Sequence, residues 1–231
     1  MNINTERIIH KNFSVPINSI IHKKSYEYRV LATLRYLFPD KYSAMILSDA
    51  PDLQDSANNT GIEVVNAVSE NDMKASRAFS ELPQYNKKKI EKIKSCGYLL
   101  SKTIHNTVAI NATGTDDGEK RIFQNAIRKK LEKIHRYNAN FKRIGLAILL
   151  PEIPTSYAES HFHKWIYETF KECNSSFDFL YVISERFCNY YDSENTTDVK
   201  ISITKEEDLC LKKIGRMTAE GEISLADIEW Q

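Results

Sequence analysis

Two acidic side chains lie in an unusual setting between residues 48 and 67, which read SDAPDLQDSANNTGIEVVNA. Asp52 directly follows a proline, and Glu63 stands inside the apolar stretch GIEVV. An unpaired carboxylate in a buried strand costs several kcal/mol or changes its pKa. We therefore expect these acids to have a partner, which is a metal ion, an arginine or a set of N–H donors.

A predicted helix precedes these acids and contributes a third one. Residues 18–38 have apolar side chains at helical spacing, which is typical of an amphipathic helix. Glu27 stands three and four residues before Val30 and Leu31, so it shares the inward face of this helix. Pro39 is expected to end the helix.

Two predicted strands would bring the acids together. Residues 41–49 favour one strand, and the β-branched stretch 61–68 favours a second. If the two strands pair as a hairpin, Asp52 and Glu63 meet at one end of the sheet, and Glu27 can approach the same place. Three converging acids repel one another unless a divalent cation neutralises them, and hard oxygen ligands suit Mg or Mn. This metal is our interpretation of the buried carboxylates.

The rest of the chain alternates predicted helices and strands, which favours an α/β fold. Residues 119–138 predict a long helix with one apolar stripe and with Arg and Lys over its remaining surface. The other expected elements are a strand at 144–150, a helix capped at Ser156, one or two strands within 177–192, and a helix capped at Thr204 and closed by Gly215. We expect one domain over residues 1–231, with a loosely attached acidic tail from about residue 218.

The average charge of the chain conceals a basic region. The whole sequence has 32 Lys and Arg against 31 Asp and Glu, a formal net charge of +1. Residues 84–143 contain 15 Lys and Arg against 5 Asp and Glu, a net of +10, which leaves the remaining chain at −9. A total charge near zero argues against wholesale nucleic-acid condensation and membrane adhesion. The basic region could contact phosphates, although lysine-rich solvated faces are common.

Cysteine use and hydropathy predict a cytoplasmic protein without a membrane partner. The four cysteines are scattered and form no CxxC or CxH pattern, which argues against a zinc cage and a secreted disulfide framework. Residues 1–13 lack an apolar run of signal-peptide length, and the apolar run 144–150 is far shorter than a membrane span. His161 and His163 stand two apart on a predicted helix, so we expect surface histidines and not metal ligands.

The order of elements between residues 25 and 75 resembles the core of the PD-(D/E)xK nuclease superfamily. In this chain the segment comprises a helix with an inward acid, a strand, the APDLQ turn, a polar bridge, the GIEVV strand and a further helix. The resemblance implies a restriction-endonuclease-like fold, with a central mixed β-sheet flanked by helices. It also implies that Asp52, Glu63 and the backbone carbonyl of Val64 are metal ligands, with Glu27 matching the acid often found on the first helix.

One position departs from the superfamily pattern. Its lysine should stand two residues after the strand acid, where this chain has Val65. In the superfamily this lysine positions the attacking water and balances developing negative charge. Lys74, on the following predicted helix, is the first candidate for a relocated lysine, and Gln54 is the second.

The resemblance implies two alternative functions. The first is a Mg- or Mn-dependent endonuclease that hydrolyses phosphodiester bonds in nucleic acid, DNA by preference, with restriction or anti-phage defence as its setting. The later order of a basic helix and strands resembles uncharacterised bacterial members of the superfamily, in which homodimers and defence complexes are the expected partners. The second is a catalytically inactive module that keeps the fold and binds nucleic acid or proteins.

Overall fold

The described chain forms two compact units in the computed structural model. The first comprises residues up to Ala67 and from Phe123 onward, and the second runs from Val68 to Ile122. The single nuclease-like domain predicted over residues 1–231 stays a prediction. The structure describes residues 19–69, 71–72, 74–75, 78, 87–96, 98–102, 107–111, 116–134, 141–151, 153–193 and 198–230.

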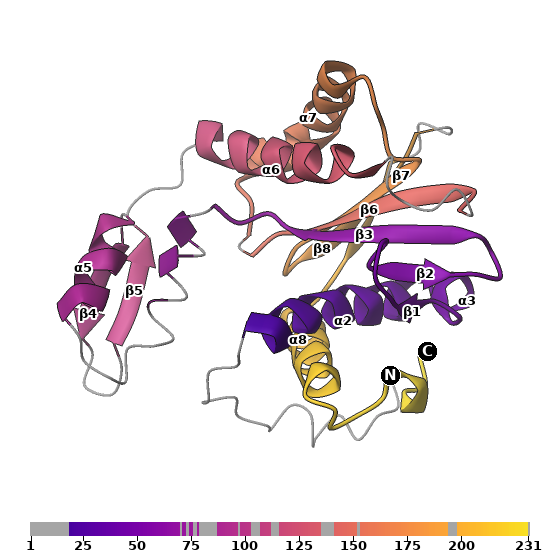
Figure 1. The fold of residues 1–231 in the computed structure, drawn as a ribbon, viewed down its shortest axis with the longest axis horizontal. Helices are drawn as coiled ribbons and strands as arrows, with labels where there is room; N and C mark the ends of the chain where they lie inside the picture. Colours follow the sequence, from indigo (N-terminus) through magenta and orange to yellow (C-terminus); the bar gives the residue numbers. More distant parts are fainter. Residues whose placement is uncertain are drawn as a thin grey trace. The chain divides into compact units, whose positions relative to one another are not determined.

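A mixed seven-stranded sheet is the centre of the first unit (Figure 1). The strands follow the spatial order β1-β2-β3-β6-β7-β8-β9, in which β3, β6 and β7 are parallel and the other neighbours are antiparallel. This arrangement confirms the predicted α/β class with a mixed sheet flanked by helices. The strand bounds are Ile46–Leu47, Leu53–Asp55, Thr60–Asn66, Arg143–Leu149, Phe179–Ile183, Phe187–Asp192 and Asp198–Ser202.

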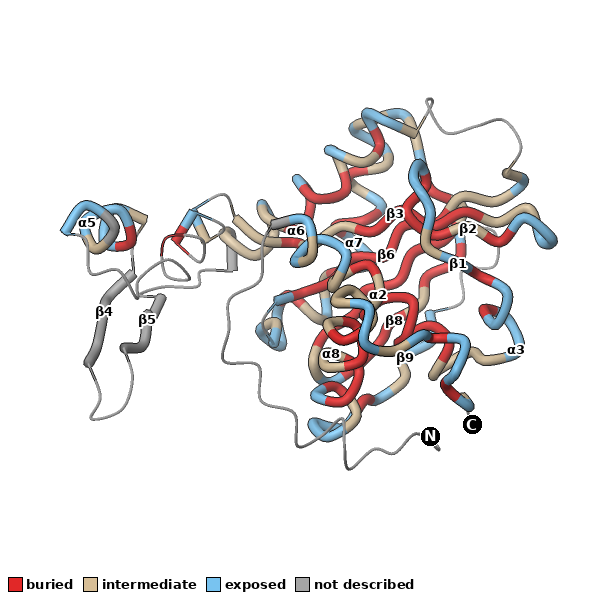
Figure 2. Tube along the Cα trace, turned by 60° about the horizontal axis from the view of Figure 1, so that its bottom comes forward, coloured by how far each residue is buried: buried red, intermediate tan, exposed pale blue. Residues whose placement is uncertain are grey.

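Helices cover both faces of this sheet, as Figure 1 shows. One face carries α2 (Ser19–Leu37) and α8 (Lys205–Ala219), and the other carries α7 (Ser156–Cys173) and the C-terminal part of α6 (Asp116–Leu131). The strands between the two layers are largely buried in Figure 2. The α2 and α8 layer buries an apolar core against β3, β6 and β7, because these strands alternate large apolar side chains toward it.

The strand register places Glu63 on the face opposite that core. Ile62 and Val64 belong to the core packed against α2 and α8, so Glu63 between them points toward the α6 and α7 layer. Glu63 lies beside Leu146 of β6 in the sheet register. The sheet therefore buries this carboxylate among apolar neighbours.

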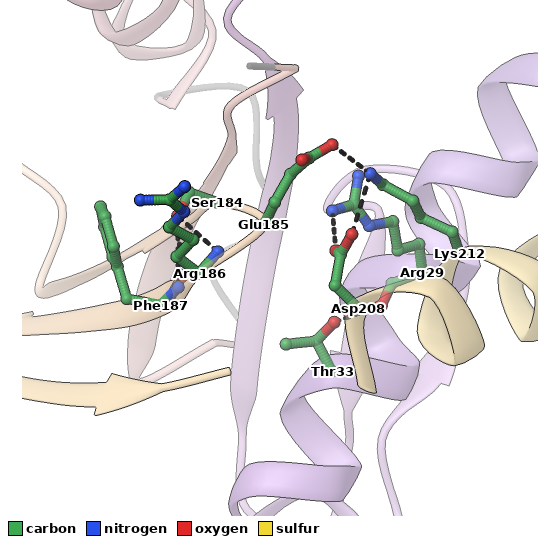
Figure 3. Close-up of polar contacts among 8 residues, drawn as sticks. All are labelled: Arg29, Thr33, Ser184, Glu185, Arg186, Phe187, Asp208 and Lys212. Atoms are coloured by element: carbon green, nitrogen blue, oxygen red, sulfur yellow. Dashed lines mark hydrogen bonds and ion pairs between the residues drawn. The ribbon is translucent and has the colours of Figure 1, made fainter. Parts of the chain in front are cut away.

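The contact between α2 and α8 depends on a glycine and on buried charges. A Cβ at Gly215 would lie 2.7 Å from the backbone nitrogen of Arg29, so only glycine permits this close approach. Arg29 donates to Asp208 across the two helices at 2.6 Å, and Lys212 pairs with Asp208 at 2.9 Å and with Glu185. Figure 3 shows these four charged side chains, which we call the α2–α8 ion cluster.

The second unit contains a short helix and a hairpin. Helix α5 (Lys87–Ser95) carries exposed lysines, and β4 (Tyr98–Lys102) pairs antiparallel with β5 (Thr107–Asn111). Ser69 Oγ accepts from the backbone N–H of Asp72 at 3.0 Å, which is the contact of a helix N-cap, and a helix follows. The described part of that helix is residues 71–72, 74–75 and 78.

Several predicted boundaries and packing relations differ from the structure. Residues 39–42 form the short helix α3 (Pro39–Tyr42) because proline is well accommodated at a helix start, and only two residues of the expected strand are extended. Thr155, one residue before Ser156, caps α7, and α8 continues past Gly215 to Ala219.

The segment after residue 218 is not loosely attached. Leu225 and Ile228 bury their side chains in the α2 and α8 core, and Arg35 donates to the Leu225 carbonyl oxygen at 3.1 Å. The prediction of a loose acidic tail is therefore wrong, because its spaced apolar residues supply core contacts. None of the described helices combines the length and apolar character that crossing a bilayer requires.

Candidate active site

Asp52 lies at the edge of the sheet, immediately before β2. Leu53 pairs with Ile62 in the antiparallel β2–β3 register, so Asp52 meets β3 just before β2 begins. There Asp52 Oδ2 accepts a hydrogen bond from the backbone N–H of Val64 at 2.8 Å. A side chain at Gly61 would collide with Pro51, so the glycine lets the proline pack against β3 and fix the residue that follows. The hairpin predicted between residues 41–49 and 61–68 is not formed, because β2, a strand that the sequence did not predict, lies between β1 and β3 and pairs with both. Asp52 stands between β1 and β2.

Lys130, near the end of α6, joins the two predicted metal-binding acids. Its Nζ lies 3.1 Å from Asp52 Oδ2 and also contacts Glu63 Oε2. The two acids are almost fully buried, and the Lys130 side chain is 18% exposed. Two carboxylates that are 11 positions apart in sequence therefore converge on one ammonium group.

A second lysine connects Asp52 to the acid on α2. Lys23 Nζ lies 3.1 Å from Glu27 Oε1 and 3.7 Å from Asp52 Oδ1, and its side chain is 70% exposed. Asp52 thus stands between Glu27 on the α2 side of the sheet and Glu63 on the α6 side. We call these five residues the acid–lysine cluster: Lys23, Glu27, Asp52, Glu63 and Lys130.

The cluster holds an excess of negative charge. With all five groups ionised, three carboxylates face two ammonium groups. Burial opposes ionisation of Asp52, but the charge of Lys130 and the Val64 N–H outweigh it and hold the Asp52 pKa below its ordinary value. For Glu27, burial raises the pKa and the neighbouring Asp52 raises it further, with Lys23 in opposition. A cation that approaches the cluster would favour the ionised form of every acid in it.

The donor chemistry fits a divalent cation at Asp52 and Glu63. Lys130 Nζ is a cationic stand-in, because it shows that an oxygen of each carboxylate can contact a single positive centre. In an extended strand the N–H and C=O of one residue point to the same side, so the Val64 carbonyl also faces the edge where Asp52 lies. Glu27 lies beside Asp52, and Lys23 contacts both of these acids. Within the described ranges, no three His, Cys, Asp or Glu side chains are already gathered in metal-binding geometry.

The two lysine substitutes considered from the sequence have different positions. Lys74 is an exposed helical residue of the second unit, which is described separately from the unit that holds Asp52 and Glu63. Its proposed role stays a prediction. Gln54 lies on β2, and its side-chain amide donates to the Pro51 carbonyl oxygen at 3.2 Å.

Lys130 was missed because α6 was treated as an apolar stripe surrounded by solvated charges. The buried positions of this helix include Phe123, Ala126 and Ile127. Lys130 follows Ala126 by four residues and Ile127 by three, so it falls on the inward stripe. The inward helical position of Lys130 was the signal in the sequence that could have identified it as a functional residue. It is the same signal that identified Glu27 on α2.

Comparison of the chain with family models, with curated proteins and with solved structures gave no match in any of the three.

Proposed function

We propose that this protein is a metal-dependent phosphodiester hydrolase that acts on nucleic acid, with DNA as the preferred substrate. The observation that carries the proposal is the convergence of Asp52 and Glu63 on Lys130 at the beginning of β2. Two buried acids and one lysine are the groups that the PD-(D/E)xK pattern requires. Here the lysine comes from α6 and not from the position of Val65.

The roles of the three side chains follow from their charges and burial. Asp52 and Glu63 would hold Mg or Mn, which when bound supplies Lewis-acid stabilisation of the charge on the phosphate. Lys130 donates hydrogen bonds from a partly buried site, where an ammonium group stabilises developing negative charge more strongly than in water. Glu27 and Lys23 border the site on the α2 side, where the exposed Lys23 can contact a phosphate of the substrate.

The basic surface of α6 supports a polyanionic substrate. Its last turn carries Arg128, Lys129 and Lys130, and Lys129 is exposed beside the inward Lys130. The exposed Lys133 follows within one further turn. Cationic side chains next to a site that binds phosphate raise the affinity for nucleic acid and make that affinity dependent on salt.

A cleavage assay tests this proposal. Plasmid DNA, single-stranded DNA and RNA are incubated with the protein in Mg or Mn, and cleavage is compared for Asp52→Asn, Glu63→Gln and Lys130→Met. Each substitution should lower the rate by about 100-fold or more, because each removes a charge that acts on the reacting phosphate. Lys205→Met, at an exposed lysine in the first turn of α8, is the matched control and should change the rate by less than about threefold. Equal cleavage by the wild type and the three site variants would refute the assignment.

One observation favours the alternative of an inactive module. Lys130 already pairs with both carboxylates, so each has a partner in the fold without a metal. A protein that had lost turnover could keep this ion pair and bind nucleic acid through α6. Calorimetric titration with Mn separates the two functions. The hydrolase requires Mn binding that disappears in Asp52→Asn, whereas the inactive module requires no Mn binding.

A further inference from the structure

A polar pocket lies between the first turns of α7 and the β8–β9 hairpin, two elements that Figure 2 labels. Its volume is about 370 Å³, near the lower end of the range for sites that bind small molecules. It lies far along the sheet from the acid–lysine cluster, since β8 and β9 are separated from β3 by β6 and β7. The lining residues are Ser156, Glu159, Ser160, His163, Asn189, Tyr191, Asp198, Val199 and Lys200.

Asn189 lines this pocket and contains a buried acceptor. The residue is only 8% exposed, and its Nδ2 donates to the Tyr191 hydroxyl oxygen at 3.1 Å. Its Oδ1 has no hydrogen-bond partner among the residues that the structure describes. Leaving a buried acceptor without a donor costs about 1–3 kcal/mol. A ligand that brings a donor would remove this cost.

Tyr191 supplies a donor beside that acceptor. Because its oxygen accepts from Asn189, its own proton remains to be donated. Burial raises the pKa of Tyr191 to about 12, with further contributions from Asp198 and Glu159, so the hydroxyl is protonated at neutral pH. The pocket thus offers the Asn189 Oδ1 acceptor beside the Tyr191 hydroxyl donor. A complementary ligand has a hydrogen-bond donor next to an acceptor along one edge.

The charged residues of the pocket disfavour a phosphate ligand. Lys200 pairs with Glu159, and His163 Nδ1 lies 3.3 Å from Asp198 Oδ2, so each cationic or titratable base has an acidic partner. The His163 and Tyr191 rings lie 6.0 Å apart at an interplanar angle of 31° and form an aromatic wall. Such a wall suits a planar ring, because stacking is tolerant of the ring's identity.

We propose that this pocket binds a nucleobase, whose planar edge sets an N–H donor beside an acceptor against Asn189 Oδ1 and the Tyr191 hydroxyl. The base comes from a free nucleoside or from an unstacked position of a nucleic-acid strand. The recognition groups are the same in both cases. This inference does not rest on the hydrolytic function, since none of its residues belongs to the acid–lysine cluster.

The test compares two adjacent tyrosines that point to opposite faces of the sheet. Adenosine, cytidine and thymidine are titrated into the protein and followed by NMR or calorimetry, with ribose and inorganic phosphate as probes that lack a base. Tyr191→Phe removes the donor and keeps the ring, and at least one nucleoside should bind about tenfold more weakly to it. Tyr190→Phe is the matched control, since Tyr190 donates to Asp192 and faces the α2 and α8 core. It should bind as the wild type does.

Two further variants complete the test. Asn189→Leu should lose nucleoside binding. Glu63→Gln should keep nucleoside binding, whether or not the protein is a nuclease. A short single-stranded oligonucleotide that competes with the nucleoside identifies a strand as the source, and one that does not compete identifies the free nucleoside. The proposal is overturned if no nucleoside binds, if ribose or phosphate binds as well as the nucleosides, or if Tyr191→Phe leaves every affinity unchanged.

Discussion

Two groups of buried charges in this protein differ in balance and in surroundings. The α2–α8 ion cluster has two cations and two anions, and its most buried pair, Arg29 with Asp208, joins two helices deep in the unit. The acid–lysine cluster has three anions and two cations and lies where β2 begins. A balanced cluster between helices suits a structural role. An excess of carboxylates at an open sheet edge suits the binding of a cation.

The largest expected effect on stability is at the α2–α8 ion cluster. Arg29→Met leaves Asp208 buried with only Lys212 as an ionic partner, and should lower the free energy of unfolding by about 3 kcal/mol. The double variant Arg29→Met with Asp208→Leu removes both buried charges and should recover most of that loss. Urea denaturation measures both values. A loss below about 1 kcal/mol in the single variant would contradict a structural role for this pair.

A smaller effect on the free energy of unfolding, which added Mn should reverse, is expected at the acid–lysine cluster. Lys130→Met leaves Asp52 and Glu63 facing each other, and should lower the free energy of unfolding by about 2 kcal/mol, since Lys23 and the Val64 N–H still act on Asp52. Added Mn should restore this loss, because a ligand that binds only the folded state stabilises it. Thermal unfolding across a Mn titration measures the recovery.

Arg29→Met is the comparison variant for that titration. Its acid–lysine cluster is unchanged, so Mn should raise its melting temperature no more than that of the wild type. If Mn raises the melting temperatures of Lys130→Met and of the wild type equally, the ammonium group of Lys130 does not occupy the position of a divalent cation. The proposed difference between the two clusters is then wrong.

The smallest expected effect concerns the pH dependence of the α2–α8 contact. Burial opposes ionisation of Glu207, but hydrogen bonds from the Tyr36 hydroxyl and from Thr204 outweigh it and lower the Glu207 pKa from its ordinary 4.5. A lowered folded-state pKa gives stability that is present above the unfolded-state pKa and is lost as the pH falls through the folded-state value. Glu207→Gln should therefore flatten the decline in stability on acidification below about pH 4.5. Urea denaturation at several acidic pH values measures this slope, and Glu206→Gln, an exposed neighbour, should leave it unchanged.

Features that depend on nearby residues were predicted well from the sequence. The helix at 18–38 and the strand at 144–150 correspond to α2 and β6, within one residue at each end. The capping box of Thr204 with Glu207 is present, because it needs only residues three apart. The burial of Glu27 and of Glu63 also followed from helical spacing and from strand alternation.

Features that depend on distant residues were predicted less well. The relocated lysine was sought on the next helix, whereas Lys130 lies 78 positions from Asp52 and 67 from Glu63. The pocket beside Asn189 likewise requires α7 and the β8–β9 hairpin to pack together. No local pattern encodes such contacts, since they arise when separate elements are placed on one sheet.

The sequence by itself determined which residues turn inward, because helical and strand periodicities are properties of neighbouring residues. It thereby identified Asp52, Glu63 and Glu27 as carboxylates that need partners. The tertiary structure alone decided that Lys130 and Lys23 are those partners, because packing of α6 and α2 on opposite faces of the sheet brings distant charges to the place where β2 begins.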